Sequence, residues 1–233
     1  MGLLSVMGAT GCAGEKEGDS EKILRFLAEK YGDEFMIHSI RQYRETMVDA
    51  WEIRAICSSN TYPLKRFDVQ ADVKLKFVHD GYDGVLVGAK CEEQIKEVAD
   101  KYFNGSQVYA AIDIGTVNQR YEAKMSPQEY FEIETLFSAI FIIMLDESDN
   151  KAEDLNEENL TSFAEDMRLL YERASIDILS LSGISYEEVV NMYIDGSIKE
   201  YVQFRTTDSR VNKNPHIVIR EGEIRALIEN DHD

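Results

Sequence analysis

The sequence has little proline, glycine or cysteine and no long apolar run, and each shortage excludes a kind of structure. Among 233 residues there are only 3 prolines, 14 glycines and 3 cysteines. Because neither proline nor glycine forms a tract, no flexible linker between domains is predicted. The most apolar stretch, residues 136–145, is far shorter than the roughly 20 residues of a membrane-spanning helix. That stretch is typical of a strand buried on both faces, so we predict no transmembrane segment.

Positive charge is also scarce. The chain has 25 Lys and Arg residues against 44 Asp and Glu residues, which gives a formal net charge of -19. Negative charge that is spread evenly over a surface repels nucleic acid and anionic lipid, so we expect no nucleic-acid partner. The favoured interpretation is a solvated acidic surface, and the alternative is a surface that binds cations or a basic partner.

The apolar content is sufficient for a folded core. Hydrophobic residues make up 44% of the chain and aromatic residues 10%. A chain of this length and composition folds as one large domain or as two small ones. The sequence shows no internal repeat, which excludes a solenoid built from repeated units.

The amino terminus carries a recognisable pattern. A short apolar run at residues 3–9 is followed by Ala9, Thr10, Gly11 and Cys12, and then by a polar stretch. This order resembles the end of a bacterial lipoprotein signal, in which small residues let a peptidase reach the bond before a cysteine that receives diacylglycerol. Such an apolar run is too short to span a bilayer as a mature helix but suits a cleaved signal.

The resemblance implies a location for the protein. Residues 1–19 are expected to be a signal remnant and tether, with lipid on Cys12, which places the folded part on the extracytoplasmic face of the cell membrane. The membrane is then a partner through the lipid anchor. The alternative is an ordinary first segment, buried or disordered, that contains a cysteine by chance.

Export bears on the two remaining cysteines. In an oxidising compartment Cys57 and Cys91 would be a candidate disulfide. Two reduced thiols in the core are the alternative, because free cysteine is among the most buried residue types.

The first half of the chain alternates between helical and extended patterns. Ser20 is expected to cap a helix that ends at Gly32, the position where a left-handed backbone is tolerated. Residues 69–77 alternate strictly between apolar and polar side chains, so this strand should have one buried face. The complete expectation is a helix over residues 20–31, strands over 35–40, 50–56 and 69–77, a helix over 92–103, and a strand over 108–117.

The second half begins with a helix start signal. Ser126 is in the capping position, Pro127 in the first turn, and Glu129 completes a capping box. The elements expected after it are a strand over 136–145, helices over 160–173 and 186–193, and strands over 176–181, 199–205 and 216–220. This order lacks the strict strand–helix rhythm of a nucleotide-binding fold. We therefore predict the α+β class, with two modules over residues 20–124 and 125–233, each an antiparallel or mixed sheet packed against helices.

The layout of the first half also resembles a group of known proteins. The segment LAEKYGDEF at residues 27–35 is followed by a strand-rich stretch and by Asp80, Gly81 and Tyr82 ahead of a helix. This arrangement is similar to that of uncharacterised surface lipoproteins of Gram-positive bacteria. Because those proteins have no assigned activity, the resemblance implies a location and no functional residues.

One segment has the pattern of a phosphate-binding loop. Residues 111–116 resemble the first phosphate loop of actin-like and sugar-kinase ATPases, in which Asp113 would hold hydrated magnesium and a glycine turn would approach phosphate. That family needs a second loop of the same kind, and residues 194–197 match it poorly. A strand that ends in a turn is the favoured interpretation, and no cofactor is predicted.

An acidic segment in the second half has the spacing of a calcium loop. The oxygen-ligand positions of an EF-hand-like loop would be filled by Asp146, Ser148, Asn150, Asp154 and Glu157. Lys151 occupies the place of the turn glycine and would bring a positive charge beside the ion. A solvated loop that leads into a helix with an acidic first turn is therefore favoured, and no metal site is predicted.

The histidines give no catalytic motif. Residues His38, His79, His216 and His232 are scattered, with no pair at the spacing of a zinc helix. His79 followed by Asp80 is a candidate base with its orienting carboxylate, but an Asp–Gly turn is the favoured interpretation. No nucleophile elbow is present. The sequence thus predicts no catalytic residue.

The function expected from these observations is binding. We expect a non-catalytic, membrane-anchored extracytoplasmic lipoprotein that binds or interacts with a protein or a small-molecule ligand. The alternative is a hydrolase or metal-dependent enzyme whose site is assembled between the two modules. A pocket with converging ionisable groups would favour the enzyme.

Overall fold

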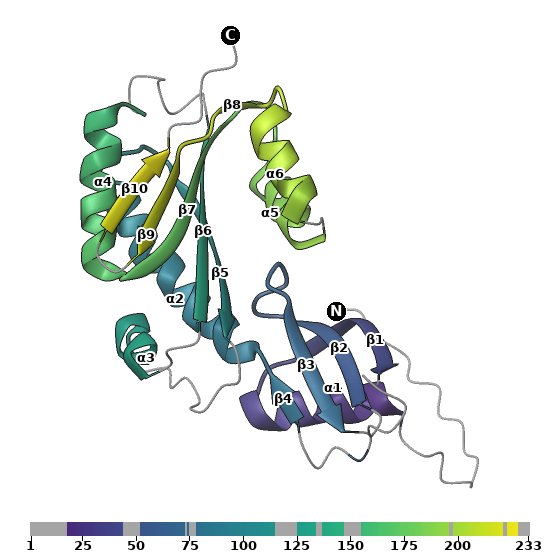
Figure 1. Ribbon diagram of the computed structural model, residues 1–233. Coiled ribbons are helices and arrows are strands. Elements are labelled where there is room, and N and C mark those ends of the chain that lie inside the picture. The colour runs from purple at the N-terminus through teal and green to yellow at the C-terminus, as the bar shows by residue number, and fades with distance from the viewer. Residues whose placement is uncertain are drawn as a thin grey trace, which may run out of the picture.

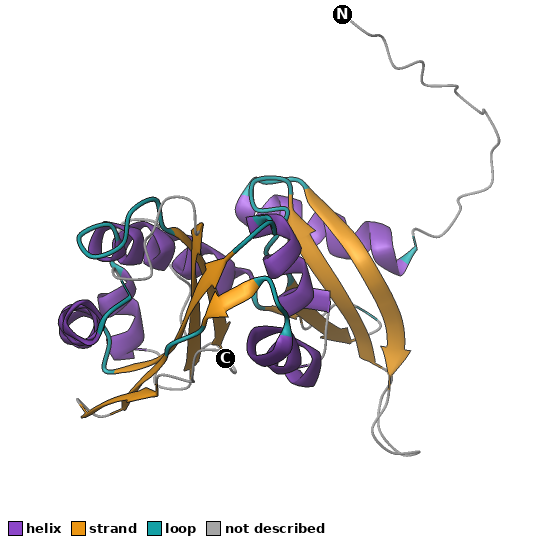
Figure 2. Cartoon of the chain, turned by 90° about the horizontal axis from the view of Figure 1, so that it is seen from above, coloured by secondary structure: helices purple, strands orange, loops and turns teal. Residues whose placement is uncertain are grey.

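The protein has two units, each built on its own β-sheet, and belongs to the α+β class as predicted. The computed structural model describes residues 18–43, 52–72, 74, 78–114, 125–133, 137–146, 155–195, 198–220 and 223–227. Seen from above, the two units lie side by side (Figure 2). Helix α2 (Tyr82–Ala99) follows the last strand of the first sheet and packs along the first strand of the second.

The first unit is a four-stranded antiparallel sheet with a helix on one face (Figure 1). Its strands lie in the order β1-β2-β3-β4. Its elements are α1 (Asp19–Tyr31), β1 (Phe35–Tyr43), β2 (Glu52–Ser59), β3 (Phe67–Asp72) and β4 (Val78–Asp80). Helix α1 ends at Gly32 with a left-handed φ of 72°, as predicted, but it begins earlier than expected, with Gly18 rather than Ser20 at the N-cap.

Strand alternation determines which face of the first sheet is buried. Ile53, Ala55 and Cys57 of β2 are buried in one cluster with Ile23 and Leu27 of α1. The residues between them in β2 project to the opposite face, because neighbouring side chains of a strand point to opposite sides. Because α1 covers the first face, the opposite face is the one that can contact the second unit.

The second unit is a mixed six-stranded sheet with helices on both faces (Figure 1). Strands β6 and β7 are parallel, whereas the other pairings are antiparallel. The strand order is β10-β9-β7-β6-β5, and β8 pairs with β7. Its elements after α2 are β5 (Gln107–Ile114), α3 (Pro127–Ile133), β6 (Phe137–Asp146), α4 (Glu157–Leu170), β7 (Arg173–Leu181), α5 (Tyr186–Asp195), α6 (Ile198–Thr207), β8 (Val211–Lys213), β9 (His216–Arg220) and β10 (Glu223–Leu227).

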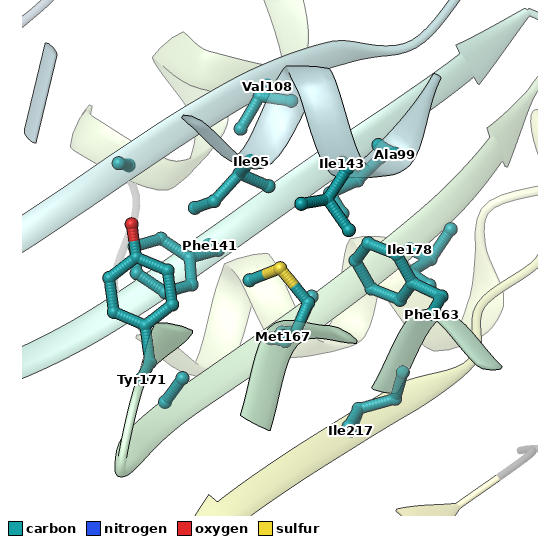
Figure 3. Close-up of a cluster of buried hydrophobic side chains, with 14 of the residues drawn as sticks. Ile95, Ala99, Val108, Phe141, Ile143, Phe163, Met167, Tyr171, Ile178 and Ile217 are labelled. Atoms are coloured by element: carbon teal, nitrogen blue, oxygen red, sulfur yellow. The ribbon is translucent and has the colours of Figure 1, made fainter. Parts of the chain in front are cut away.

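Strand β6 is an interior strand of this sheet, between β7 and the edge strand β5, and is buried as its continuous apolar sequence predicts. Phe141 and Ile143 pack with α2 and α4, together with Phe163 and Met167 of α4 (Figure 3). Ile142 lies in the other cluster, under α5 and α6. Both faces of the strand are therefore buried, which explains why it has no polar alternation.

The predicted capping box at α3 is confirmed. The Ser126 N–H donates to Glu129 Oε2 at 2.7 Å, and the Glu129 N–H donates back to Ser126 Oγ at 3.2 Å. Two backbone donors at the helix start are satisfied in this way, which fixes where α3 begins.

One predicted element of the second half is wrong, and the sheets divide at another residue than the predicted modules. Residues 199–205 form helix α6 and not a strand, since Tyr201 and Phe204 are spaced by one helical turn and bury the same side. The module boundary at residue 124 also differs from the division between the sheets. Strand β5, which was assigned to the first module, pairs with β6 along its whole length.

The candidate disulfide is not formed in the structure. Cys57 and Cys91 are free thiols, and both are buried. Cys57 lies in the cluster under α1, whereas Cys91 lies in the cluster between α2, α4 and the second sheet. Burial raises the pKa of each thiol to about 12, so both are protonated at neutral pH.

Candidate ligand site between the two sheets

A cavity of about 340 Å³ lies where the two units meet. Its first-unit wall consists of the β2–β3 loop, parts of β3 and β4, and the start of α2. Its second-unit wall consists of β5, the end of α5 and part of α6. The volume falls at the lower end of the roughly 300–1,000 Å³ that is usual for ligand pockets. The cavity is therefore sized for a small molecule.

Strand alternation places polar side chains of the first sheet in the cavity wall. Phe67 and Val69 are buried under α1, so Asp68 between them projects to the opposite face. His79 of β4 is the partner of Gln70 in β3, and it therefore lies on the same face as Asp68. Both Asp68 and His79 line the cavity.

A buried ion pair forms the base of the cavity. Lys65, with a side chain only 8% exposed, places its Nζ 2.6 Å from Glu92 Oε1 of α2. The same Nζ donates to the Ala110 carbonyl at 2.9 Å, and the Ala110 N–H donates to Glu92 Oε1 at 2.8 Å. Ala110 belongs to β5, an edge strand of the second sheet, so the ion pair takes up backbone groups that a further strand would otherwise bind.

Burial of this ion pair shifts the pKa of both residues. Desolvation by burial lowers the pKa of Lys65 and raises the pKa of Glu92, while the attraction between them opposes both shifts.

The close approach of α2 to β5 favours a glycine at residue 88. A Cβ at Gly88 would lie 3.1 Å from the Ala110 carbonyl oxygen, a contact tighter than side chains normally make.

Tyr109 of β5 contributes a hydroxyl group to the cavity. The residue is only 5% exposed and lines the cavity. Its ring has Lys65 Nζ 4.5 Å from the centroid, and the Tyr193 ring 5.8 Å away. Its hydroxyl makes no hydrogen bond to any residue that the structure describes, and burial raises its pKa. Because Tyr109 lines the cavity, this hydroxyl is available there to a ligand or to water.

An ion pair joins the two units at the cavity. Arg66 of the β2–β3 loop contacts Asp195 at the end of α5. Both side chains are partly exposed, so the pair adds little stability, but it connects elements that are far apart in the sequence.

Behind the tyrosines lies a buried cluster around Asp177 of β7. The Tyr201 hydroxyl donates to Asp177 Oδ2 at 3.0 Å, and His216 Nδ1 lies 2.6 Å from Asp177 Oδ1. Arg205 forms an ion pair with the same carboxylate oxygen. Strand register aligns these groups, because Tyr109, Ile142, Asp177 and His216 are successive cross-strand partners in β5, β6, β7 and β9.

Removal of the Tyr201 hydroxyl is expected to affect the stability of the fold much more than removal of the Tyr109 hydroxyl. Tyr201→Phe is expected to lower the free energy of unfolding by about 1.5–3 kcal/mol, because a hydrogen bond to a buried carboxylate is lost. Tyr109→Phe is expected to change it by less than about 0.5 kcal/mol, because no protein hydrogen bond is lost. Urea unfolding of both variants measures the difference. A loss of similar size in Tyr109→Phe would show that its hydroxyl has a partner.

The structure separates the candidate pair of His79 and Asp80. Asp80 lies on the α1 side of β4, where its carboxylate accepts hydrogen bonds from Lys30 at 2.8 Å and from the Tyr31 hydroxyl at 2.6 Å. His79 projects to the opposite face and lines the cavity. Asp80 therefore holds α1 on the sheet and does not orient His79.

Other sequence candidates lie partly or wholly outside the described residues. Cys12 and His232 are outside them, as are the turn after Asp113 and most of the acidic loop after Asp146. His38 of β1 contacts Ser58 at 2.8 Å and does not line the cavity. Over the described ranges, no group of three or more His, Cys, Asp and Glu side chains is placed to hold a metal ion.

The principal residues of this site were missed at the level of sequence. Lys65, Glu92 and Tyr109 lie in different elements, and no local spacing connects them. Asp177 did give a signal, since it is the one charged residue in the apolar strand sequence ASIDILSL. A charge in such a strand is expected to be buried with a partner.

Comparison with known proteins shows the fold of this chain and no more. No family model matches the chain, and no curated protein matches it. Among solved structures it is similar to the crystal structure of a DUF5037 family protein from Ruminococcus gnavus ATCC 29149. The TM-score is 0.62 at 20% sequence identity, over 90% of this chain and 94% of that chain. The similarity thus covers most of both chains and indicates a shared architecture.

Proposed function

We propose that the protein is a lipid-tethered binding protein on the extracytoplasmic face of a bacterial membrane, and that it holds a small molecule in the cavity between its two sheets. The observation that carries this proposal is the cavity itself, to which both units contribute and in which the Tyr109 hydroxyl makes no hydrogen bond to the described part of the chain. Concave sites at the junction of two units, with a few polar groups among aromatic side chains, are typical of ligand binding.

The arrangement of charges favours binding over catalysis. Lys65 is held by Glu92, and Arg66 is held by Asp195, so neither cation of the lining is a free acid or nucleophile. The pKa of Lys65 is lowered, but its ammonium group is committed to the edge of β5. These interactions preserve the shape of the cavity.

A second candidate function is the hydrolase or metal-dependent enzyme. The observation in its favour is the contact between His216 and Asp177, since a carboxylate on Nδ1 leaves Nε2 as the nitrogen that exchanges protons. Tyr201 connects this pair to the cavity wall. Among the described residues, however, no hydroxyl or thiol nucleophile is hydrogen-bonded to His216.

The tether is tested by changing Cys12. In the native organism, Cys12→Ser is expected to abolish incorporation of a palmitate analogue and to release the protein from the membrane fraction. Two acyl chains make a stable anchor, whereas a protein with none has no such attachment. Ser20→Ala is the control and should be labelled like the wild type. Equal labelling of Cys12→Ser would contradict the tether.

The choice between binding and catalysis is tested by a turnover screen. The full chain is expected to give no turnover of ester, phosphate, peptide or glycoside substrates, with or without divalent metal, because Lys65 and Arg66 of the cavity are engaged in ion pairs. Product formation would be followed by chromatography. Activity that disappears in His216→Asn, while circular dichroism shows the variant to be folded, would favour the enzyme over the binding protein.

A further inference from the structure

Lys65 and Arg66 of the cavity lining are paired with carboxylates before any ligand enters. Lys65 is paired with Glu92 and Arg66 with Asp195, and Asp68 adds one further carboxylate. The chain as a whole carries a formal charge of -19. A compensated lining in an acidic protein gives no net attraction to an anionic ligand.

A cationic ligand is also poorly matched to this cavity. The ring of Tyr109 already has the Lys65 ammonium group 4.5 Å from its centroid, and this charge repels a second cation from the same ring. Asp68 is the one carboxylate in the lining, and its exposed position lets solvent screen it.

The polar groups that remain include both donors and acceptors. The Tyr109 hydroxyl has no partner among the described residues and can donate or accept, and the Asp68 carboxylate accepts. Arg66 has five N–H donors in its guanidinium group, and Asp195 contacts only one of its nitrogens. Ligand hydroxyls match such a mixed set, because each hydroxyl both donates and accepts.

The second-unit wall offers aromatic surface beside these groups. The rings of Tyr109, Tyr193 and Tyr201 contact one another edge to face, with centroids 5.8 Å and 5.2 Å apart. All three residues line the cavity. A ring that has C–H groups on its faces and hydroxyls on its rim fits between tyrosines and polar side chains.

From this combination we infer that the ligand is a small, uncharged, hydroxyl-rich ring compound, such as a cyclic polyol or a small sugar. The inference rests on the proposed binding function and specifies its ligand class. The cavity of about 340 Å³ limits the ligand to a small one. The Tyr109 hydroxyl is assigned a direct hydrogen bond to it.

The experiment compares three classes of probe on the purified full chain. The uncharged probes are glucose, maltose and myo-inositol, the anionic probes are citrate and glucose 6-phosphate, and the cationic probe is choline. Thermal shift and titration calorimetry measure binding to the wild type, to Tyr109→Phe, and to Tyr43→Phe as a control outside the cavity. At least one uncharged probe is expected to bind, about tenfold more weakly to Tyr109→Phe and equally well to Tyr43→Phe.

The outcomes separate the ligand class from the binding function. Binding of a charged probe that depends on Tyr109, with none of the uncharged probes, would overturn the ligand class and leave the cavity as the binding site. Uncharged probes that bind equally to Tyr109→Phe would overturn the assigned hydrogen bond. Absence of binding by all three classes would contradict both the inference and the proposed function.

Discussion

Lys65→Met is expected to lower the free energy of unfolding by about 3–5 kcal/mol, because it leaves the Glu92 carboxylate buried without its cation. The Lys65 side chain is 8% exposed and that of Glu92 21%, so solvent screens the pair only in part. The same substitution removes the donor to the Ala110 carbonyl on the edge of β5. Urea unfolding, followed by circular dichroism, measures the loss.

Two further variants separate the buried charge from other effects. The double variant Lys65→Met with Glu92→Leu is expected to recover much of the loss, because no unpaired charge remains. Lys90→Met, which breaks an exposed pair with Glu93 on the same helix, should cost less than about 0.5 kcal/mol. If Lys65→Met and Lys90→Met had equal effects, the ion pair would not be a structural element of the cavity.

Asp177→Ala is expected to have an effect of similar size, also about 3–5 kcal/mol. The carboxylate is 7% exposed and accepts from Tyr201, Arg205 and His216. Its removal leaves the Arg205 guanidinium, only 11% exposed, without its counter-ion. The Nε of Arg205 already lacks a partner within the described part of the chain, so no second acceptor takes over.

A matched control for Asp177 lies in the same unit. Asp208 also pairs with an arginine, Arg210, at 2.8 Å, but this pair is partly exposed. Hydrogen bonds from Arg210 lower the pKa of Asp208 to about 2, yet solvent screens the interaction. Asp208→Ala is therefore expected to cost less than about 1 kcal/mol. Equal losses in the two variants by urea unfolding would mean that burial does not determine the effect.

Patterns that depend on neighbouring residues allowed most of the fold to be predicted. The α+β class, the capping box at Ser126 and the burial of both faces of β6 all follow from short-range spacing. Helix α6 was mistaken for a strand because residues 199–205 also alternate loosely between polar and apolar. The first ten residues of α2 were missed, because Gly84 and Gly88 lower helix propensity, and Gly88 is explained only by the nearby β5.

The candidate site could not be predicted in the same way. Lys65 and Glu92 meet across 27 residues of sequence, and Asp177 and His216 meet across 39. Which strand is adjacent to which decides both contacts, and strand order is not encoded in local periodicity. Tyr109 lies in the cavity because β5 joins the second sheet. The predicted module boundary at residue 124 had grouped β5 with the first sheet.

The ion pair on Ala110 also bears on aggregation. An exposed edge strand is a template on which other chains can add by backbone pairing, and natural proteins commonly block such edges with charged side chains. Here the block at β5 comes partly from Lys65, which belongs to the other unit. Loss of structure in the first unit would therefore uncover the edge of the second. Folding of the small sheet protects the large one from intermolecular β-pairing.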